Sequence, residues 1–280
     1  MESLTNLRLL AQGGQALIYE YGEGRVLRVL RNPDDAELLQ YEIAITKALL
    51  GSDVSVPEVY ESLTVDGKPA VAVQRIPGIS MLAYMKAHPL KLKTLAHTLA
   101  ELHIAVSAAH VPGLKPARGR ARVLTDKSAV LSLEDKAFVQ QLIEALPDGE
   151  ALCHGDFHPG NILMHDGKHY IIDWFGAYQG DMLSDAAHTY LILKNVPRFP
   201  GVSALAHVVM KLSGVMLAHA YLRSLRGLTD VDMGQFSRWL AVKAAERSFY
   251  GMPAEKPLLV RFIEKCRQHQ SEPASWYTFM

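Results

Sequence analysis

The stretch that decides the fold runs from His154 to Asp173 and reads His-Gly-Asp-Phe-His-Pro-Gly-Asn-Ile-Leu-Met-His-Asp-Gly-Lys-His-Tyr-Ile-Ile-Asp. Within it, Asp156 and Asn161 lie five residues apart. The Pro-Gly pair between them excludes a helix, so both side chains can converge from a loop. The stretch therefore concentrates acids and an amide on a segment whose conformation is set by turn residues.

A short hairpin is predicted directly after this loop. The apolar segments 162–164 and 170–172 flank an Asp-Gly turn, which is typical of two antiparallel strands. Folding the hairpin back brings Asp173 beside Asn161 and gives one carboxylate and one amide oxygen as hard ligands for Mg²⁺. Asp156 is then the candidate proton acceptor. This combination predicts a phosphoryl-transfer site, where positioning and charge stabilisation matter most.

The motif resembles that of a known family. His-Gly-Asp-Phe-His-Pro-Gly-Asn followed by Ile-Ile-Asp-Trp is similar to the aminoglycoside phosphotransferase and choline kinase family. It keeps the His-x-Asp-x-x-x-x-Asn spacing of the protein-kinase catalytic loop, with Gly155 where protein kinases usually carry Arg. Trp174 stands where protein kinases have Phe-Gly. Both departures favour the small-molecule branch.

The resemblance implies a fold, cofactors and further residues. The expected fold is α+β and two-lobed like that of protein kinases, with a small antiparallel β-sheet lobe and a larger, mainly helical lobe. The expected cofactors are Mg²⁺ and ATP or GTP as phosphoryl donor. Gly180-Asp181 and Asp185 resemble the family's Gly-Asp-x-x-x-Asp segment, which implies that Asp181 helps to brace the catalytic loop.

The histidines of the stretch leave an alternative, a metal-hydrolase site. His154, Asp156, His158, His165 and His169 form a possible metal cluster, but transition-metal sites favour helical or hairpin-matched spacing, which Pro-Gly interrupts here. We expect His154 to be a core histidine that bonds main chain, and His165 and His169 to be solvated hairpin residues. For His158, a structural role and a phosphate contact both stay open.

The first lobe is predicted to begin with three antiparallel strands, at 7–10, 16–21 and 25–30, separated by glycine-containing turns. The Gly13-Gly14 turn either lets main-chain N–H groups approach a phosphate or is a plain hairpin turn. Arg28 sits where the family carries a Lys or Arg that holds nucleotide phosphates. A helix is predicted over 34–50, and its Glu42 is expected to pair with Arg28 like the Lys–Glu pair of kinases.

Two further strands, at 58–65 and 70–76, complete a predicted five-stranded lobe. The composition changes from strand-like to helical after Pro77-Gly78, so the predicted domains are a nucleotide-binding lobe, 1–76, and a helical lobe with the catalytic loop and acceptor pocket, 77–280. In kinase-like folds the link between lobes binds the adenine edge through main-chain atoms. The implied contacts are Gln74, Arg75 and Ile76.

The remaining chain is predicted to be helical. Helices are expected over 91–109, 133–146, 186–193, 202–226, 230–250 and 257–268. The basic segment Lys115 to Arg122 is expected to be a solvated loop, with anion binding as the alternative. The apolar stretch from Val202 to Leu222 contains a lysine and two histidines, which favours a buried helix over a membrane span. The aromatic end 276–279 is expected to pack on the helices, with capping of the pocket as the alternative.

Composition sets few limits on partners. The net formal charge is zero, hydrophobic residues make up 49% and the two cysteines are too few for a disulfide framework. Nothing in the first residues resembles a signal segment, so a cytoplasmic location is predicted, with no nucleic-acid or membrane partner. The oligomeric state and the choice between ATP and GTP stay open.

Charge distribution bears on the phosphate acceptor. Residues 186–280 carry twelve Lys or Arg and six Asp or Glu, a net of +6, whereas 154–185 has a net of −4. A site for a polycationic antibiotic should be rimmed by carboxylates, because clefts of one sign concentrate ligands of the other. The prediction is a small-molecule kinase whose acceptor hydroxyl belongs to a neutral or anionic compound rather than an aminoglycoside. The alternatives are a kinase-fold regulator without turnover and a protein kinase.

Overall fold

The computed structural model describes residues 4–196 and 201–280, which belong to two compact units. Unit 1 comprises Met1–Tyr84, Ala109–Gly113 and Pro159–Ala177, and unit 2 comprises Met85–Ala108, Leu114–His158 and Tyr178–Met280. The catalytic stretch thus contributes to both units and passes from one to the other after His158. The division into lobes at residue 76 stays a prediction; the first segment of unit 1 continues to Tyr84.

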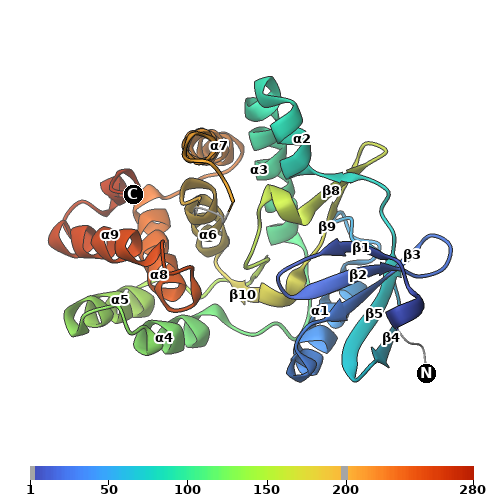
Figure 1. Ribbon diagram of the computed structural model, residues 1–280. Helices are drawn as coiled ribbons and strands as arrows, with labels where there is room; N and C mark the ends of the chain where they lie inside the picture. Colours follow the sequence, from blue (N-terminus) through green and yellow to red (C-terminus); the bar gives the residue numbers. More distant parts are fainter. Residues whose placement is uncertain (1–3, 197–200) are drawn as a thin grey trace. The chain divides into compact units, whose positions relative to one another are not determined.

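A five-stranded antiparallel sheet forms the centre of unit 1 (Figure 1), with the strand order β1-β2-β3-β5-β4. The strands are β1 (Leu9–Gln12), β2 (Ala16–Glu20), β3 (Arg25–Leu30), β4 (Val59–Val65) and β5 (Lys68–Gln74). Each predicted strand of the first lobe is present, within a few residues of its predicted ends. The order follows from short turns that join neighbouring strands, with one longer connection between β3 and β4.

Helix α1 (Ala36–Leu49) makes that longer connection and covers one face of the sheet. A single 3₁₀ turn precedes it, and the Asn32 side chain accepts the N–H of Asp34 at 3.1 Å, so the predicted helix start is confirmed. Side chains alternate along β3. Leu27 belongs to the core on the far face of the sheet, whereas Leu30 packs with α1. The same alternation points Arg28 towards α1.

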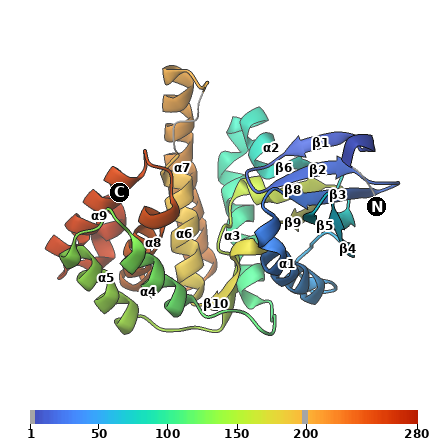
Figure 2. The same cartoon turned by 60° about the horizontal axis from the view of Figure 1, so that its bottom comes forward.

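The predicted hairpin after the catalytic loop is also present in unit 1. Strands β8 (Ile162–His165) and β9 (Lys168–Ile171) pair antiparallel, and β6 (Ile79–Ser80) pairs with β8 (Figure 2). Asp166 and Gly167 have φ of 47° and 74°, both left-handed. A two-residue turn with this geometry matches the twist of the strands, which is why Asp-Gly predicts it well.

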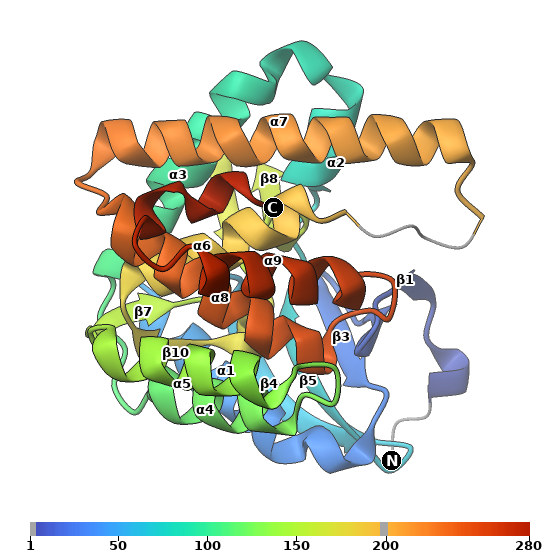
Figure 3. The same ribbon diagram turned by 90° about the vertical axis from the view of Figure 1, so that its left-hand side faces the viewer.

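Unit 2 is mainly helical (Figure 3). Helix α7 packs against α3 and α6, and α8 packs against α4, α6 and α9. A two-stranded antiparallel ladder of β7 and β10 leads into and away from the catalytic stretch. The bounds are α3 (Leu92–Ala108), α4 (Ala117–Lys127), α5 (Leu133–Ala145), β7 (Ala151–Cys153), β10 (Tyr178–Gly180), α6 (Met182–Lys194), α7 (Ala204–Leu228), α8 (Met233–Tyr250) and α9 (Lys256–Gln268). Helix α2 (Met81–Ala87) begins in unit 1 and ends in unit 2.

Helix α4 corrects the prediction of a solvated loop from Lys115 to Arg122. Its buried residues, Ala117, Ala121 and Thr125, repeat every four positions and pack as one narrow face. The basic side chains lie on the other sides, where Arg118 and Arg122 pair with acids at the end of α5 and just beyond it. The prediction was wrong because small residues carry the packing here, and a proline and a glycine nearby suggested a loop.

Helix α7 confirms the prediction of a buried helix only for its second half. Its second half is buried through residues such as Leu217, Tyr221 and Leu225, but its first half exposes Leu205 and Leu212. Among the described residues, α7 is the one helix with the length and apolar composition of a membrane span, and 28% of that window is buried. Core helices of globular proteins share these properties, so the observation is weak evidence of a membrane contact.

Candidate active site

Arg28 on β3 stands at the centre of a charged cluster in unit 1. Its guanidinium forms an ion pair with Glu42 of α1 and lies 3.3 Å from Asp173 Oδ1. The predicted pairing of Arg28 with Glu42 is confirmed. Burial raises the pKa of Glu42, and the charge of Arg28 counteracts that rise. A buried carboxylate of this kind needs its cation, because an unpaired buried charge is strongly unfavourable.

The two residues after Asp173 contact both members of the Arg28–Glu42 pair. The main-chain N–H of Trp174 donates to Glu42 Oε1 at 3.2 Å, and the Arg28 guanidinium lies 4.4 Å from the centre of the Phe175 ring. Asp173 itself has φ 71° and ψ 62°, a left-handed conformation that is uncommon for a residue other than glycine. Such conformations persist where surrounding contacts enforce them, and they are frequent at functional sites.

The hairpin brings Asn161 and Asp173 together as predicted. The N–H of Ile172 donates to the carbonyl oxygen of Asn161 at 3.0 Å, and Ile162 is paired with Ile171. Asp173 therefore follows directly after the residue bonded to Asn161. The main chains of Asn161 and Asp173 are therefore adjacent, and both side chains carry oxygen atoms. The side chain of Asp173 is 35% exposed.

The Gly13-Gly14 turn connects β1 to β2. The N–H of Gly13 donates to the Ala16 carbonyl at 2.8 Å, and the Gly13 carbonyl accepts from Arg31 Nε at 3.1 Å. This is the bonding of a plain hairpin turn. A Cβ at Gly14 would meet no atom within 4 Å, so the turn does not require glycine there for space. A phosphate contact by these two residues stays a prediction.

The predicted adenine contacts follow β5. The N–H groups of Gln74 and Arg75 donate to the carbonyls of Glu58 and Gly24, and the carbonyl of Ile76 accepts from Gly78. These main-chain groups are already hydrogen-bonded to other main-chain groups of unit 1. In the part of the chain that the structure describes, the N–H of Ile76 is the one amide of these three without such a bond.

Asp156 belongs to unit 2 and lies on the loop after β7. His158 Nε2 is 3.6 Å from Asp156 Oδ2, and the N–H of Asp156 donates to His154 Nδ1 at 3.2 Å. Although burial acts to raise the pKa of Asp156, its hydrogen bond to His158 and the charges of His158, His188 and His154 hold that pKa well below its usual range. The carboxylate is therefore ionised at neutral pH.

Asp185, near the start of α6, holds the catalytic loop. Its carboxylate accepts the N–H of His154 at 2.6 Å and that of Gly155 at 2.9 Å. This corrects the assignment of that bracing to Asp181. The Asp181 side chain instead caps α6 through the N–H of Leu183 at 2.8 Å, and it accepts from Trp239 Nε1 of α8 at 2.9 Å.

A buried relay stands behind Asp185. His103 Nε2 lies 3.1 Å from Asp185 Oδ2, and His103 Nδ1 lies 2.7 Å from the hydroxyl of Tyr221. Burial acts to raise the pKa of Asp185, but the hydrogen bond and charge of His103 hold it well below its usual range. These contacts connect α3 and α7, through Asp185, to the loop that carries Asp156.

The histidines follow the expected structural roles for the most part. His154 is fully buried and bonds main chain, as predicted, whereas His158 pairs with Asp156. His165 is paired with Asp166 in the hairpin turn and is only partly exposed. Over residues 4–196 and 201–280, no group of three or more His, Cys, Asp or Glu side chains has the arrangement of a metal cage. The metal-hydrolase alternative therefore finds no support.

Comparison with known proteins assigns the family. The model of the phosphotransferase enzyme family, APH, matches residues 7–226, well over half of the chain. The chain belongs to the phosphotransferase enzyme family. This phosphotransferase transfers phosphate to a hydroxyl group of a small molecule, as the catalytic stretch predicts. No curated protein matches the sequence.

Solved structures show that this phosphotransferase has the protein-kinase-like fold. Aminoglycoside-3′-phosphotransferase of type VIII aligns with TM-score 0.62 and 21% identity over 87% of this chain and 93% of that one. A thermostable mutant of aminoglycoside phosphotransferase APH(4)-Ia, in ternary complex with AMP-PNP and hygromycin B, has TM-score 0.61 and 16% identity over 98% and 90%. The GDP and kanamycin complex of APH(2″)-IIIa has TM-score 0.60 and 17% identity over 99% and 92%.

Sequence reasoning missed several contacts of this phosphotransferase. The bond from the Trp174 amide to Glu42 and the stacking of Phe175 on Arg28 join segments more than 130 residues apart, and no local pattern announces them. The role of Asp185 carried a signal, since it is the second acid of the Gly-Asp-x-x-x-Asp segment. Its burial and two amide contacts, rather than its spacing, identify it as the brace.

Proposed function

We propose that this protein transfers the γ-phosphoryl group of ATP or GTP to a hydroxyl of a neutral or anionic small molecule, with Asp156 as the residue that receives the hydroxyl proton. The observation that carries the proposal is the loop geometry at Asp156. The preceding amides of His154 and Gly155 are fixed by Asp185, and His158 contacts the Asp156 carboxylate. A single ionised carboxylate is thereby held on a rigid support.

Unit 1 supplies the nucleotide side of this proposal. Arg28, which is paired with Glu42, would contact phosphate oxygens. Asn161 and Asp173 would hold Mg²⁺, since both offer oxygen ligands at adjoining points of the hairpin, and Mg²⁺ is commonly bound by one or two side chains together with substrate phosphates. The ion would neutralise charge on the transferring phosphoryl group. The N–H of Ile76 is the candidate donor to the nucleotide base.

In the proposed reaction the protein forms no covalent bond to the substrates. The acceptor oxygen forms a bond to the γ-phosphorus, the bond to the bridging oxygen breaks, and the nucleoside diphosphate leaves with that electron pair. The hydroxyl proton passes to the Asp156 carboxylate. Because the low pKa of Asp156 makes it a weak base, we infer that it orients the hydroxyl first and accepts the proton late in the reaction.

The charges of the helical region support an acceptor that is not a polycation. Arg247 of α8 is close enough for its pKa to be raised by Asp156, although Glu255 contributes more. Arg120 and Arg247 both lower the pKa of Tyr250, which burial raises, and Tyr250 also feels the charge of Asp156. Arg247 is thus one cationic group near the Asp156 carboxylate, but Glu255 balances its charge; the net charge of +6 over residues 186–280 is what disfavours a highly cationic ligand. The structures in complex with kanamycin and hygromycin B belong to other proteins of the same fold.

The proposal is tested by nucleotide turnover with a library of hydroxyl compounds. Purified protein with Mg²⁺ is offered ATP or GTP together with sugars, polyols, hydroxy acids, sugar phosphates, amino alcohols, choline and aminoglycosides. We expect at least one neutral or anionic compound to stimulate nucleotide consumption. Asp156→Asn should lower that rate by about 10²- to 10⁴-fold, as expected for loss of a positioned base. Asp230→Asn, an exposed acid between α7 and α8, is the matched control.

Two results would contradict the proposal. One is phosphorylation of aminoglycosides alone, which would refute the acceptor class but keep the kinase. The other is nucleotide binding with no turnover for any compound in the library, which would favour the regulator alternative. Phosphorylation of a generic protein substrate, absent in Asp156→Asn, would instead support the protein-kinase alternative.

A further inference from the structure

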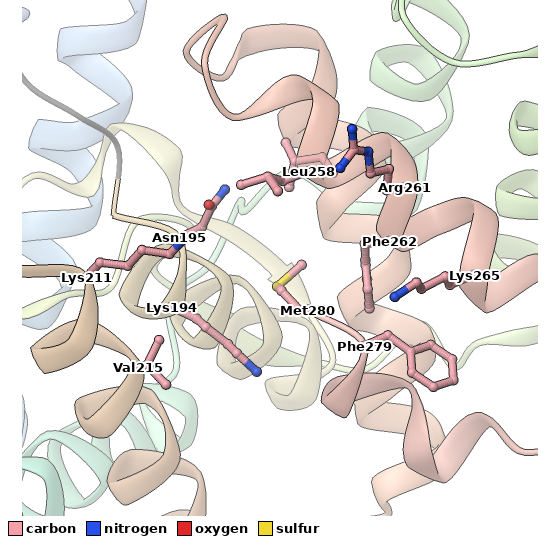
Figure 4. A pocket seen from close by; sticks show the side chains of 11 residues that line it. Lys194, Asn195, Lys211, Val215, Leu258, Arg261, Phe262, Lys265, Phe279 and Met280 are labelled. Atoms are coloured by element: carbon pink, nitrogen blue, oxygen red, sulfur yellow. The ribbon is translucent and has the colours of Figure 1, made fainter. Parts of the chain in front are cut away.

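A pocket of about 300 Å³ lies in unit 2, between the end of α6, the helices α7 and α9, and the last residues of the chain (Figure 4). Four of its lining residues are basic: Lys194, Lys211, Arg261 and Lys265. Its lining includes apolar side chains such as Phe262 and Phe279 but no Asp or Glu side chain. The pocket therefore combines a concentrated positive charge with an apolar wall.

Lys194 makes this charge unusual, because it is buried without a counter-ion. The residue is 9% exposed, and its ammonium donates to the Tyr190 hydroxyl at 3.1 Å and to the Tyr277 carbonyl at 3.3 Å. His219 Nε2 lies at 3.5 Å. Among the residues that the structure describes, no carboxylate lies within ion-pair distance of Lys194. Burial of an ammonium with neutral partners alone is unfavourable, and an anion bound in the pocket would offset it.

The other three basic residues surround this site from two helices. Lys211 comes from α7, and Arg261 and Lys265 lie one turn apart on α9. Figure 4 shows the side chains of Lys211 and Lys265 reaching in from opposite sides of the Met280 side chain. All three are exposed, and none of them has an ion-pair partner in the described part of the chain. They form an exposed cationic rim around the buried ammonium of Lys194.

Contacts lead from the pocket to Arg247, whose charge acts on Asp156. Asn195, which lines the pocket, lies with Nδ2 3.5 Å from Glu255 Oε2. Glu255 is buried and bound by Arg247, whose Nη2 is 3.0 Å from Oε1. Arg247 in turn interacts electrostatically with Asp156. Because Glu255 is neutralised by Arg247, it does not cancel the charge of the pocket.

We propose that this basic pocket binds the anionic group of the phosphate acceptor, a carboxylate or a phosphate, while a hydroxyl of the same molecule reaches Asp156. This inference rests on the function proposed above and specifies its substrate class. The anion would lie between Lys194 and the basic rim, and the apolar wall of Phe262 and Phe279 would cover the carbon skeleton. An acceptor with several ammonium groups would be repelled by the same residues.

The first test measures binding without turnover. Calorimetry on the intact protein uses citrate and glycerol 3-phosphate as anionic probes, glycerol as the neutral probe and spermidine as the cationic probe. We expect citrate or glycerol 3-phosphate to bind, and Lys211→Gln/Lys265→Gln to weaken that binding at least about tenfold, which corresponds to about 1.4 kcal/mol. The control Lys93→Gln/Lys127→Gln removes two exposed lysines elsewhere in unit 2 and should bind like the wild type.

The second test uses the acceptors found by the turnover screen. We expect these compounds to carry a carboxylate or a phosphate, and their KM to rise at least about tenfold in Lys211→Gln/Lys265→Gln but not in the control. Comparison of hydroxy acids with sugar phosphates separates the two sources of anionic oxygen. Because both lysines are exposed on helix surfaces, their removal should leave the fold intact, which thermal unfolding would verify.

The outcomes separate this inference from the proposed function. Anion binding that the double variant loses, without any turnover, would support the pocket and contradict the kinase proposal. Turnover of neutral acceptors whose KM is the same in the double variant would support the kinase and overturn the pocket. Failure of both anionic probes to bind, or equal binding of glycerol and glycerol 3-phosphate, would also overturn the inference.

Discussion

Asp185 accepts the main-chain N–H of His154 at 2.6 Å, so an acid 31 residues further along the chain fixes the loop that carries Asp156. The same carboxylate accepts the N–H of Gly155 and contacts His103. The buried Asp185 carboxylate thus binds two main-chain amides of the loop and one imidazole of α3. The position of Asp156 therefore depends on a residue outside its own loop.

Asp185→Asn should therefore damage both stability and turnover. An amide offers one acceptor oxygen where the carboxylate offers two, and its NH₂ group would face a main-chain donor. We expect the free energy of unfolding to fall by about 3 kcal/mol, the scale for a disrupted buried charge network, and kcat to fall with it. Urea unfolding and nucleotide turnover measure the two effects. Asp232→Asn, at the N-cap of α8, is the control because Asn caps a helix as well as Asp. An unchanged urea midpoint for Asp185→Asn would refute the brace.

The Arg28–Glu42 pair should serve nucleotide binding rather than stability. Replacement of both residues, Arg28→Met/Glu42→Leu, leaves neither charge of the pair buried alone. The partly exposed Asp173 carboxylate loses its contact with Arg28 and the Trp174 N–H loses its acceptor, which costs less than an unpaired buried charge, so the fold should survive. We expect its nucleotide affinity to fall at least about tenfold, or about 1.4 kcal/mol. Calorimetry with ATP and thermal unfolding give the two quantities. The control is Arg25→Met on the same strand, whose guanidinium lies over the Tyr60 ring instead. Retained affinity in the double variant would show that Arg28 does not contact phosphates.

Asp173→Asn should remove the metal dependence of nucleotide binding. Asn tolerates the left-handed conformation of this position, so the main chain should hold, but the amide lacks the charge that attracts Mg²⁺. We expect Mg²⁺ to strengthen ATP binding in the wild type and to have little effect in the variant. Asp166→Asn changes a left-handed acid in the turn of the same hairpin and should behave like the wild type. An equal response to Mg²⁺ in both variants would exclude Asp173 as a ligand.

His188 predicts a specific loss of stability in mild acid. Burial, aided by the charge of Lys243, lowers its pKa from 6.5 to about 3, and its Nε2 lies 3.2 Å from the Tyr250 hydroxyl. Between these two values the unfolded chain binds a proton that the folded chain does not, so stability falls as pH drops below 6.5. The loss from His188 alone should reach roughly 2 kcal/mol near pH 5.

His188→Gln should remove that part of the pH dependence, because a glutamine can keep a hydrogen bond to Tyr250 without titrating. Urea unfolding between about pH 7.5 and 5 measures the slope. The control is His97→Gln on α3, a half-exposed histidine that should leave the slope unchanged. Equal slopes for wild type and His188→Gln would show that folding does not lower the pKa of this histidine.

Local sequence signals predicted the parts of the fold that local chemistry controls. The Asp166-Gly167 turn, the start of the first helix and the alternating strands were correct, because in each case the residue type and the conformation are directly linked. Helix α4 escaped prediction because its packing face consists of small residues. The exposed first half of α7 was mistaken for core, since apolar periodicity does not reveal whether a partner covers the helix.

The candidate site divides in the same way. The motif identified Asp156, Asn161 and Asp173, and the strand–helix pattern identified Arg28 with Glu42. A net charge of +6 over the last third favoured an acceptor that is not polycationic, but a count does not locate charges. The grouping of basic residues from three helices in one pocket, and the burial of Lys194 there, depends on long-range packing that no sequence window contains.

The most direct test of the account follows the phosphoryl group itself. ATP labelled in its γ-phosphoryl group is incubated with the wild type, Asp156→Asn and Asp230→Asn, each with Mg²⁺ and the acceptor selected by the turnover screen, and the label is traced by mass spectrometry. The account predicts labelled acceptor phosphate ester from the wild type and Asp230→Asn, and a rate at least about 10²-fold lower from Asp156→Asn. Label that appears only in inorganic phosphate, or ester formed by Asp156→Asn at the wild-type rate, would contradict it.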